Sequence, residues 1–488
     1  MGVINFQKFI KTNHPGSYRS QWLERYDNIY MDLNFLLHMI LNKSNSQKQI
    51  LSNLKFLIIT LLSCYPVKRI ILCADGQAPL AKLFLQRKRR ITMALGGDSD
   101  CIESEQISEH MIGLNFTPGT EFMKNLEANL SDLTTYLRIQ YNVLVIYDVN
   151  NLDEGEVKIR RYVGQFMELD RNETHLIFSG DSDQILLLAS LPELKNVYMS
   201  NCTMVLSIGL MIEHHFKKFG RGGSYQWDFI FLNLLLGNDY LPKIGLISIE
   251  RVWAAYHIIF RNNNNEKLVV GIDPLIINPI IFHDLIYYMV RSSSPHLQKF
   301  NINDIQHPKY KNYIECIAWC FEIYTTGGCR SYRTIYDSFD EDTEKISHTI
   351  NPWGVVLSMM TFRTITPKQS KPINQNLYSI LLIPKAATDL IDRSNESYKM
   401  VVAKFPIIYE AEECLECRDN LKKNKLINKQ LSGYTAIDEN GIDNLMVDGL
   451  KKERVIIRRK IIIHKNKHRP ITIKKIQEME KIFIDSTI

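Results

Sequence analysis

The sequence predicts an α/β fold in which a mainly parallel sheet is flanked by helices, followed by a mostly helical C-terminal region. Up to about residue 260, short apolar runs alternate with longer amphipathic segments, which is the pattern of strands that alternate with helices. Acidic residues directly follow several of these runs, as ligand-binding residues do at the carboxyl edge of an open parallel sheet. The alternation stops at the polar run 261–265, which predicts a domain boundary there.

Five apolar runs are the expected strands, and the amphipathic segments between them are the expected helices. In chain order they are NIYMDL (28–33), VKRIILCAD (67–75), NVLVIYD (142–148), THLIFSGD (174–181) and NVYMSN (196–201). We therefore expect an α/β domain over 1–260, a mostly helical and irregular region over 266–445, and a basic tail over 446–488.

Seven carboxylates stand where the expected elements end or begin. Asp32, Asp75, Asp181 and Asp183 follow strands, Glu154 and Glu156 in NLDEGEVK open a helix, and Asp239 in LLLGNDYLP ends an apolar helix. A single Asp at such a place is usually a turn or helix-cap residue. Because the carboxyl ends of parallel strands meet at one edge of a sheet, we expect these seven side chains to converge.

Seven converging carboxylates repel one another unless cations neutralise them. Oxygen-only ligands suit the hard cations Mg²⁺ and Mn²⁺. Two such ions are a common device for phosphodiester cleavage. The carboxylates therefore predict a catalytic site with two Mg²⁺ ions, or Mn²⁺ in their place.

A basic helix is expected immediately after Asp75, in the stretch GQAPLAKLFLQRKRR. Pro79 suits a helix start, and Lys82, Gln86, Arg89 and Arg90 then share one face. Guanidinium and ammonium groups on one face can hold a terminal phosphate at several points. The alternative is a solvated charged face.

The net charge of +6 is unevenly distributed along the 488 residues. Residues 451–475 carry eleven Lys or Arg and one Glu, a net +10, so the rest of the chain carries −4. This tail predicts binding to a polyanion such as nucleic acid, or a solvated face that packs in part on the body. Cys414 and Cys417 with His464 and His468 have the spacing of zinc ligands, with two surface cysteines as the alternative.

The composition also predicts the compartment. The longest purely apolar runs are far below the roughly 20 residues that span a bilayer, and the N-terminus lacks the apolar core of a signal peptide. The nine cysteines show no disulfide spacing, which fits a reducing compartment. We expect a soluble intracellular protein without membrane contact.

With these motifs in order, the chain resembles the Xrn family of 5′-to-3′ exoribonucleases. The motifs are MGV, MDLNFLLH (31–38), ADGQAPLAKLFLQRKRR (74–90), FTPGTEFM (116–123), EGEVK (154–158), SGDSDQILLLA (179–189) and GNDYLP (237–242). Residues 313–332 and 351–360 resemble, more weakly, a second conserved region of the family that packs on the catalytic domain. The resemblance implies a nuclease core like those of PIN and FEN proteins over 1–260.

The resemblance also implies the activity and its residues. Members degrade single-stranded RNA with a 5′-monophosphate to 5′-mononucleotides, in the cytoplasm or the nucleus, and we expect a monomer whose protein partners are unknown. The seven carboxylates are implied as catalytic metal ligands. Lys82, Gln86, Arg89 and Arg90 are implied as the 5′-phosphate pocket, and His38 as the ring that stacks on the first base.

Three departures from the family pattern stand out. The Pro-Gly before the glutamate pair is Leu152-Asp153 here, and the tryptophan-rich Ser-Trp segment is Ser331, Tyr332, Arg333 and Thr334, so the sequence does not identify the second stacking aromatic. The chain is also short, as a minimal version of the family, such as a virus-encoded one, would be. Two alternatives stay open: a flap-type DNA nuclease, which shares the Asp-Gly-x-x-Pro and Gly-x-Asp-Tyr elements, and a non-catalytic RNA-binding protein on a nuclease fold.

Overall fold

The computed structural model describes most of the chain. The described residues are 3, 6–19, 23–41, 44, 46–94, 112–217, 225–245, 247–262, 266–291, 308–336, 339–340, 345–346, 349–361, 369–414, short stretches between 416 and 431, 444–465 and 471–485. The chain folds as two compact units. Unit 1 comprises residues 1–82 and 124–372, and unit 2 comprises residues 83–123 and 373–488. The polar run 261–265 thus falls inside unit 1.

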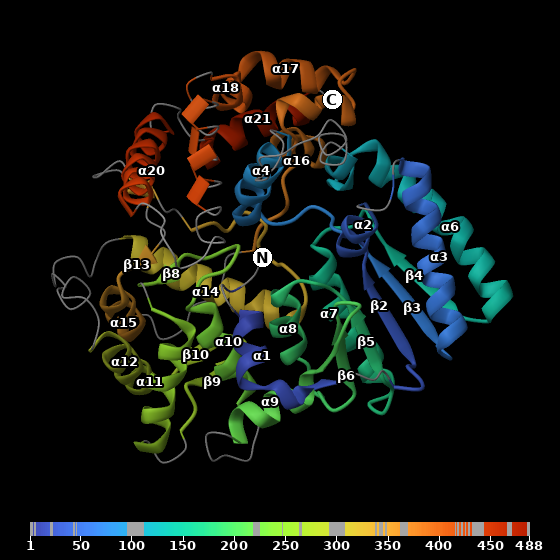
Figure 1. Cartoon of the computed structure of the whole chain (residues 1–488), viewed down its shortest axis with the longest axis horizontal. Coiled ribbons are helices and arrows are strands. Elements are labelled where there is room, and N and C mark those ends of the chain that lie inside the picture. The colour runs from blue at the N-terminus through green and yellow to red at the C-terminus, as the bar shows by residue number, and fades with distance from the viewer. Residues whose placement is uncertain are drawn as a thin grey trace. The chain divides into compact units, whose positions relative to one another are not determined.

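Unit 1 contains a seven-stranded sheet in the order β1-β7-β6-β5-β2-β3-β4 (Figure 1). The strands are β1 (Tyr18–Arg19), β2 (Asn28–Asp32), β3 (Arg69–Cys73), β4 (Leu144–Asp148), β5 (His175–Phe178), β6 (Val197–Ser200) and β7 (Val205–Ser207). All five predicted strands are confirmed as β2 to β6, and they run parallel to one another. Two short strands are additional: β7 pairs antiparallel with β6, and β1 pairs antiparallel with β7 at the edge of the sheet.

The strand order places the acidic motifs next to one another. β2 lies between β3 and β5, and all five of its residues are buried, as expected for a central parallel strand that is covered on both faces. Asp32 at the end of β2 pairs with Cys73 at the end of β3, and Met31 pairs with Phe178 at the end of β5. The three segments that carry Asp32, Asp75 and Asp181 therefore leave the sheet side by side.

Helices cover this sheet. They are α1 (Phe6–Asn13), α2 (Leu33–Leu41), α3 (Gln47–Cys64), α6 (Glu121–Tyr141), α7 (Gly155–Leu169), α8 (Ser182–Ala189) and α9 (Ile208–Lys217), with a 3-10 turn at Pro15–Ser17. Figure 1 shows α3 to the right of β2, β3 and β4, and α7 and α8 to the left. The apolar face of α7 packs against β2 and β3, and Ser46 caps the start of α3 by accepting the Gln49 N–H at 3.3 Å.

The rest of unit 1 is mainly helical. Its elements are α10 (Gln226–Leu234), β8 (Lys243–Ile244), α11 (Ile249–Asn262), β9 (Val269–Ile272), β10 (Leu275–Ile277), α12 (Pro279–Val290), α14 (Pro308–Thr326), β11 (Phe339–Asp340), β12 (Lys345–Ile346), β13 (Thr349–Ile350) and α15 (Pro352–Thr361). α14 packs on α7, α8 and α10, and its Trp319 is fully buried. The segment 313–332, which resembles the family's second conserved region, therefore forms part of the core beneath the acidic strand ends.

Unit 2 is helical, which confirms the predicted C-terminal region. Its elements are α4 (Leu80–Ala94) from Leu83 onward, a 3-10 turn at Leu114–Phe116, the start of α6, α16 (Gln375–Leu382), a 3-10 segment at Lys385–Leu390, α17 (Glu396–Lys404), α18 (Ile407–Glu413), α20 (Asn444–Lys465) and α21 (Ile473–Asp485). α21 packs on α16 and α17 through Ile476, Met479 and Phe483. Within the described residues, no helix combines the length and apolar character that a membrane crossing requires.

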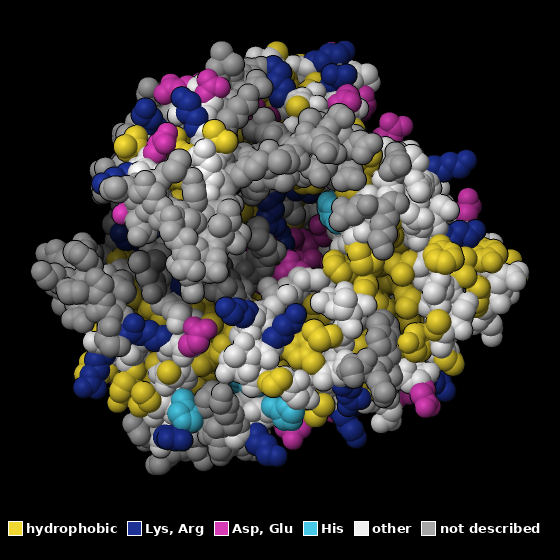
Figure 2. Space-filling view, viewed as in Figure 1, with side chains coloured by type: hydrophobic (Ala, Val, Ile, Leu, Met, Phe, Trp, Pro, Cys, Tyr) yellow, Lys and Arg dark blue, Asp and Glu magenta, His cyan; other side chains and the backbone are white. Residues whose placement is uncertain are grey.

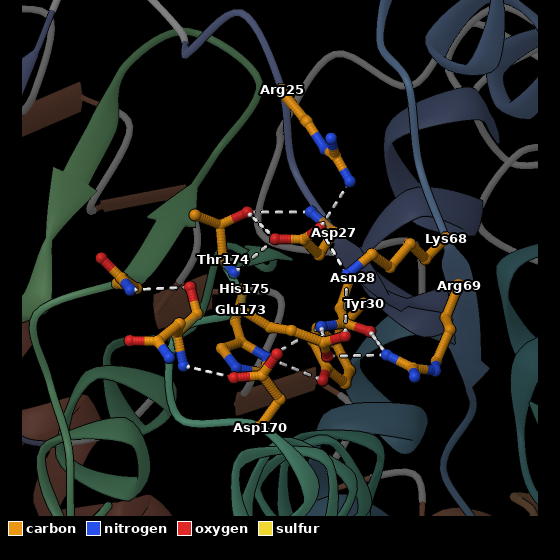
Figure 3. A network of polar contacts seen from close by, with 12 residues as sticks. Arg25, Asp27, Asn28, Tyr30, Lys68, Arg69, Asp170, Glu173, Thr174 and His175 are labelled. Carbon is orange, nitrogen blue, oxygen red and sulfur yellow. Dashed lines mark hydrogen bonds and ion pairs between the residues drawn. The ribbon is translucent and has the colours of Figure 1, made fainter.

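A polar network joins the starts of β2, β3 and β5, at the sheet edge opposite the acidic strand ends (Figure 3). Glu173 accepts hydrogen bonds from Asn28 at 2.9 Å, from Lys68 at 3.1 Å and from Arg69 at 2.6 Å. The Tyr30 hydroxyl and the His175 Nδ1 share a hydrogen bond at 3.0 Å. Because a one-residue slip of a strand would break these bonds, the network supports the register that aligns the carboxyl ends.

Candidate active site

The carboxylates at the strand ends are held by bonds from neighbouring backbone and side chains. The Asp32 Oδ1 accepts the Phe35 N–H at 3.1 Å, which places this carboxylate as the cap of α2. Its Oδ2 accepts the Ser179 hydroxyl at 3.3 Å, which ties β2 to the end of β5. Asp181 caps α8 in the same way, through the Asp183 N–H at 3.0 Å. The cap role that a single Asp usually has is therefore present at both residues, in addition to their convergence.

The glutamate pair sits at the start of α7, close to Asp75. The Asp75 Oδ1 accepts the Gly155 N–H at 2.9 Å, and the Asp75 N–H donates to the Asn34 Oδ1 at 2.8 Å. Gly155 lies between Glu154 and Glu156, so this bond brings the Asp75 carboxylate next to both glutamates. Both glutamates are buried, and Figure 2 shows Asp and Glu side chains gathered near the centre of the viewed face.

The Lys82 side chain faces three of the carboxylates. Its Nζ contacts Glu154, lies 3.4 Å from Asp239 and lies 3.6 Å from Glu156. Burial lowers the pKa of Lys82, but the charges of these carboxylates outweigh burial and hold the pKa well above its ordinary value. The ammonium group is therefore a permanent positive charge inside the acidic cluster.

The cluster strongly perturbs its own carboxyl groups. Burial, with the charges of Glu156 and Asp75, raises the pKa of Asp32 well above its ordinary value. Burial also raises the pKa of Glu156 to about 7, against the opposing effect of Lys82. Burial and the charges of Asp181 and Asp239 raise the pKa of Asp183 to about 8. These mutual effects mean that the predicted carboxylates form one electrostatic group.

The donor chemistry of this group fits a hard cation. The Asp183 Oδ1 is buried and has no hydrogen-bond donor in the described structure, and such an oxygen is usually satisfied by a partner. All seven groups offer oxygen, as Mg²⁺ and Mn²⁺ prefer. In the described part of the chain, however, no three acidic, His or Cys side chains already surround a common point as a metal site does, so the metal-ligand roles remain a prediction.

The residues of the predicted phosphate face follow one another along α4. Lys82 is committed to the carboxylates of unit 1. In unit 2 the buried Gln86 accepts the Tyr378 hydroxyl at 2.9 Å, and the Arg90 Nε donates to the Thr117 hydroxyl at 2.7 Å. Arg89 is half-buried on the same helix, and His38 is exposed on α2 in unit 1. The four α4 residues thus share one helix face as predicted, while their roles toward a phosphate stay untested.

Several residues at this site escaped the sequence analysis. The Tyr240 hydroxyl contacts the Glu154 Oε2, while Lys82 contacts the Oε1, so both oxygens of Glu154 are held. Lys158 is fully buried and bonds the Ala74 carbonyl at 2.9 Å and the Asp148 Oδ1 at 3.0 Å, which ties the ends of β3 and β4. The signal for Lys158 was a lone Lys on the apolar face of its helix, within EGEVK.

The absence of a side chain at Gly180, which lies in the site, has a steric reason. A Cβ at Gly180 would lie 2.5 Å from the Phe35 ring, so the turn between β5 and Asp181 can pack on α2 only without a side chain. The zinc prediction also involves Cys417, His464 and His468, which lie outside the residues whose side chains are described.

Residues 1–198 match the family model described as the XRN 5'-3' exonuclease N-terminus. Among curated proteins, the chain is 25% identical to 5'-3' exoribonuclease 1 of Saccharomyces cerevisiae over 304 residues, which cover 51% of this chain and 20% of the relative. It is 26% identical to 5'-3' exoribonuclease 1 of Homo sapiens over 303 residues, covering 51% and 18%. It is also 27% identical to 5'-3' exoribonuclease 2 of Emericella nidulans over 198 residues, covering 34% and 19%.

The chain thus spans about a fifth of the length of these curated relatives. Among solved structures, the catalytic core of Rad2 in complex with DNA substrate is similar at a TM-score of 0.33 and 12% identity, over 83% of this chain and 99% of that chain. A TM-score of this size does not establish a common fold. The matches to the curated relatives confirm the resemblance that the sequence motifs predict.

Proposed function

We propose that the chain, whose residues 1–198 match the family model of the XRN 5'-3' exonuclease N-terminus, is a 5′-to-3′ exoribonuclease of the Xrn family that degrades single-stranded, 5′-monophosphorylated RNA to 5′-mononucleotides. One observation carries the proposal most directly. Buried and half-buried carboxylates from the ends of β2, β3 and β5 and from the start of α7 perturb one another, and the Lys82 ammonium lies against Glu154 and Glu156 within this group. Such a costly concentration of buried charge is typical of a catalytic site.

The proposed cofactor is a pair of Mg²⁺ ions, with Mn²⁺ as a substitute, held by Asp32, Asp75, Glu154, Glu156, Asp181, Asp183 and Asp239. Bound there, the ions supply Lewis-acid stabilisation of the charge that develops on the phosphate oxygens. The orphaned Asp183 Oδ1 supports this assignment. The backbone and hydroxyl bonds to Asp32, Asp75 and Asp181 keep their carboxylates oriented before any ion binds.

The proposed role of α4 is to bind the 5′ end. Arg89 and Arg90 each offer a forked guanidinium, and Lys82 and Gln86 lie on the same helix face. A 5′-monophosphate offers an anion that guanidinium and ammonium groups can bind, whereas a 5′-hydroxyl does not. The proposed role of His38, whose ring is exposed, is to stack on the first base. The exposed lysines of α20 would add contacts to the RNA backbone.

The central test compares RNAs that differ only at the 5′ end. End-labelled RNA with a monophosphate, triphosphate or hydroxyl, and a circular RNA, are incubated with the protein in Mg²⁺ or in EDTA. We expect mononucleotide release from the monophosphate RNA in Mg²⁺ alone. We expect the wild type to degrade the monophosphate RNA about 10- to 150-fold faster than the hydroxyl RNA, because the hydroxyl end loses one charge-assisted contact. The double variant Arg89→Ala, Arg90→Ala should lose most of this preference.

The alternatives are distinguished by the same reactions. Cutting of circular RNA, or equal degradation of the RNAs with all three 5′ ends, would contradict the exonuclease proposal. Either result would favour a flap-type nuclease, which cleavage of a flap DNA substrate would then test. RNA binding without cleavage in Mg²⁺ would instead favour a non-catalytic protein. Asp183→Asn serves as the matched inactive control, because it keeps the side-chain shape and cannot ionise to a carboxylate. We propose the cytoplasm as the compartment, with the nucleus as the alternative.

A further inference from the structure

Asp153 has an unusual backbone conformation directly before the glutamate pair. Its φ is 79°, a value that residues with a side chain rarely adopt. The other described non-glycine residues with positive φ are Asn142 and Cys202, which are exposed and half-buried, whereas Asp153 is buried. A buried residue keeps such a conformation when its surroundings hold it, and such positions cluster at functional sites.

The surroundings of Asp153 hold both its carboxylate and its backbone. Its Oδ1 accepts the Tyr332 hydroxyl at 2.5 Å, and its Oδ2 contacts the Arg161 guanidinium. Its N–H donates to the Gln77 carbonyl at 3.1 Å, and its carbonyl accepts the Gly76 N–H at 2.9 Å. We name Asp153, Arg161 and Tyr332 the Asp153 clamp. The clamp joins the loop after β3, the second turn of α7 and the segment after α14.

Tyr332 bonds both to the segment that carries Glu154 and to the helix that carries Lys82. Its hydroxyl binds the residue before Glu154, while its carbonyl accepts the Leu80 N–H at 2.9 Å, at the start of the helix that carries Lys82. The position of Tyr332 is itself set by Ser370, whose carbonyl accepts the Tyr332 N–H at 3.2 Å. One residue therefore connects the start of α7 with the start of α4, and so Glu154 with Lys82.

We propose that Asp153, Arg161 and Tyr332 are positioning residues that set the placement of Glu154 against Lys82 in the reaction proposed above, on which this inference rests. Through Tyr332, the segment after α14, which lies beyond the family match at 1–198, is necessary for efficient catalysis. Tyr332 is 7% exposed and its hydroxyl is committed to Asp153. It acts through Asp153 and does not stack on a base.

The test separates the carboxylate of Asp153 from its backbone conformation. Asp153→Gly accepts a positive φ without cost and removes the carboxylate, and Tyr332→Phe removes only the hydroxyl. We expect each to lower kcat about tenfold to a hundredfold, as for loss of one hydrogen bond to a charged group. The KM for RNA should change less than about threefold, because the clamp does not touch the substrate. The double variant should resemble Asp153→Gly alone.

Tyr313→Phe is the matched control. The Tyr313 hydroxyl is fully buried in unit 1 and has no hydrogen-bond partner in the described structure, so its removal should leave kcat unchanged. Asp153→Asn keeps an acceptor for Tyr332 and should recover part of the activity that Asp153→Gly loses. If Asp153→Gly cannot be purified folded, the comparison of Asp153→Asn with Tyr332→Phe decides the same question.

Hydrogen exchange provides a readout that does not depend on activity. The amides of residues 154–158 should exchange at least about tenfold faster in Asp153→Gly and Tyr332→Phe, but not in Tyr313→Phe. If the wild type cleaves no RNA, the proposed function fails, and the exchange data still judge the clamp. Asp153→Gly with wild-type kcat and wild-type exchange would overturn the inference, as would a loss in the double variant that equals both single losses combined.

Discussion

At the scale of single residues, Glu154 shows how the site is held. Its two oxygens contact different partners, the Lys82 ammonium and the Tyr240 hydroxyl, and all three side chains are buried. The Lys82 ammonium also lies 5.7 Å from the centre of the Tyr240 ring, within the range of a cation–π contact. Tyr240 therefore orients the glutamate with its hydroxyl and supports the lysine with its ring.

Tyr240→Phe is a sharp test of this arrangement, because it removes the hydroxyl and keeps the ring packed on Trp319. We expect kcat on 5′-monophosphorylated RNA to fall about tenfold, since Glu154 loses a hydrogen bond to a charged oxygen in a buried place. The fold should survive. Single-turnover cleavage and the melting temperature check both points. A wild-type kcat in Tyr240→Phe would show that Lys82 alone holds Glu154.

At the scale of elements, α4 divides its basic residues between two tasks. Arg87 is buried in unit 2, where it donates to the Leu381 carbonyl at 2.6 Å and to the Ile408 carbonyl and contacts Glu412 at 2.5 Å. Its neighbour Lys88 is exposed. The run QRKRR is therefore partly a structural anchor, and only part of it can bind a substrate.

Arg87→Leu should destabilise unit 2 by about 3 kcal/mol, because it leaves the Glu412 carboxylate and two carbonyls without their donor. Lys88→Leu, which removes the same charge one residue later, should change stability by less than about 0.5 kcal/mol. Urea unfolding followed by hydrogen exchange in α16 and α18 measures both variants. Equal effects of the two substitutions would contradict the anchoring role of Arg87.

The starts of the strands give a prediction about pH. Burial lowers the pKa of His175 from 6.5 to about 4, and its Nε2 is buried without a partner among the described residues. Between these two pH values the unfolded chain binds a proton at His175 that the folded chain does not bind. Stability should therefore fall as the pH drops from 6.5 to 4, by on the order of 3 kcal/mol from this group.

Unfolding by urea at several pH values tests this dependence. His175→Gln, whose side-chain carbonyl can still accept the Tyr30 hydroxyl, should remove much of the slope between pH 6.5 and 4. His283→Gln is the control, because His283 is about half exposed and its removal should leave the slope unchanged. Identical slopes in the wild type and His175→Gln would show that His175 does not control the acid sensitivity.

At the scale of the whole molecule, the basic tail divides into two parts within unit 2. α21 packs on α16 and α17 with buried Ile476 and Met479, so its apolar face is structural. Lys451, Lys452 and Lys460 on α20 are exposed. A deletion of residues 451–475 would remove the start of α21 and confuse packing with binding, so substitutions are the better test.

Lys451→Gln, Lys452→Gln and Lys460→Gln together should weaken RNA binding and reduce its salt dependence. If each lysine neutralises one phosphate of single-stranded RNA, the slope of log K against log salt should fall by about 2. Turnover at saturating RNA should stay unchanged. Lys8→Gln, Lys11→Gln and Lys48→Gln remove the same number of exposed lysines from α1 and α3 and serve as the control. An equal effect of both triples would indicate general charge attraction.

The sequence by itself determined the order of the strands along the chain and the acidic residue at each strand end. Alternating apolar and amphipathic runs are local patterns, and the carboxyl ends of parallel strands must meet, so β2 to β6 and the convergence of Asp32, Asp75 and Asp181 followed from them. The strands β1 and β7 are too short for such a pattern.

Only the tertiary structure decided which side chains hold those carboxylates. Lys82 reads in sequence as one member of a basic helix face, yet its ammonium contacts Glu154. Tyr332, Asp153 and Arg161 lie far apart along the chain or point in directions that no local pattern encodes, yet they share one buried contact. Partners of this kind depend on long-range packing, because a side chain's environment is set by the elements around it and not by its neighbours in sequence.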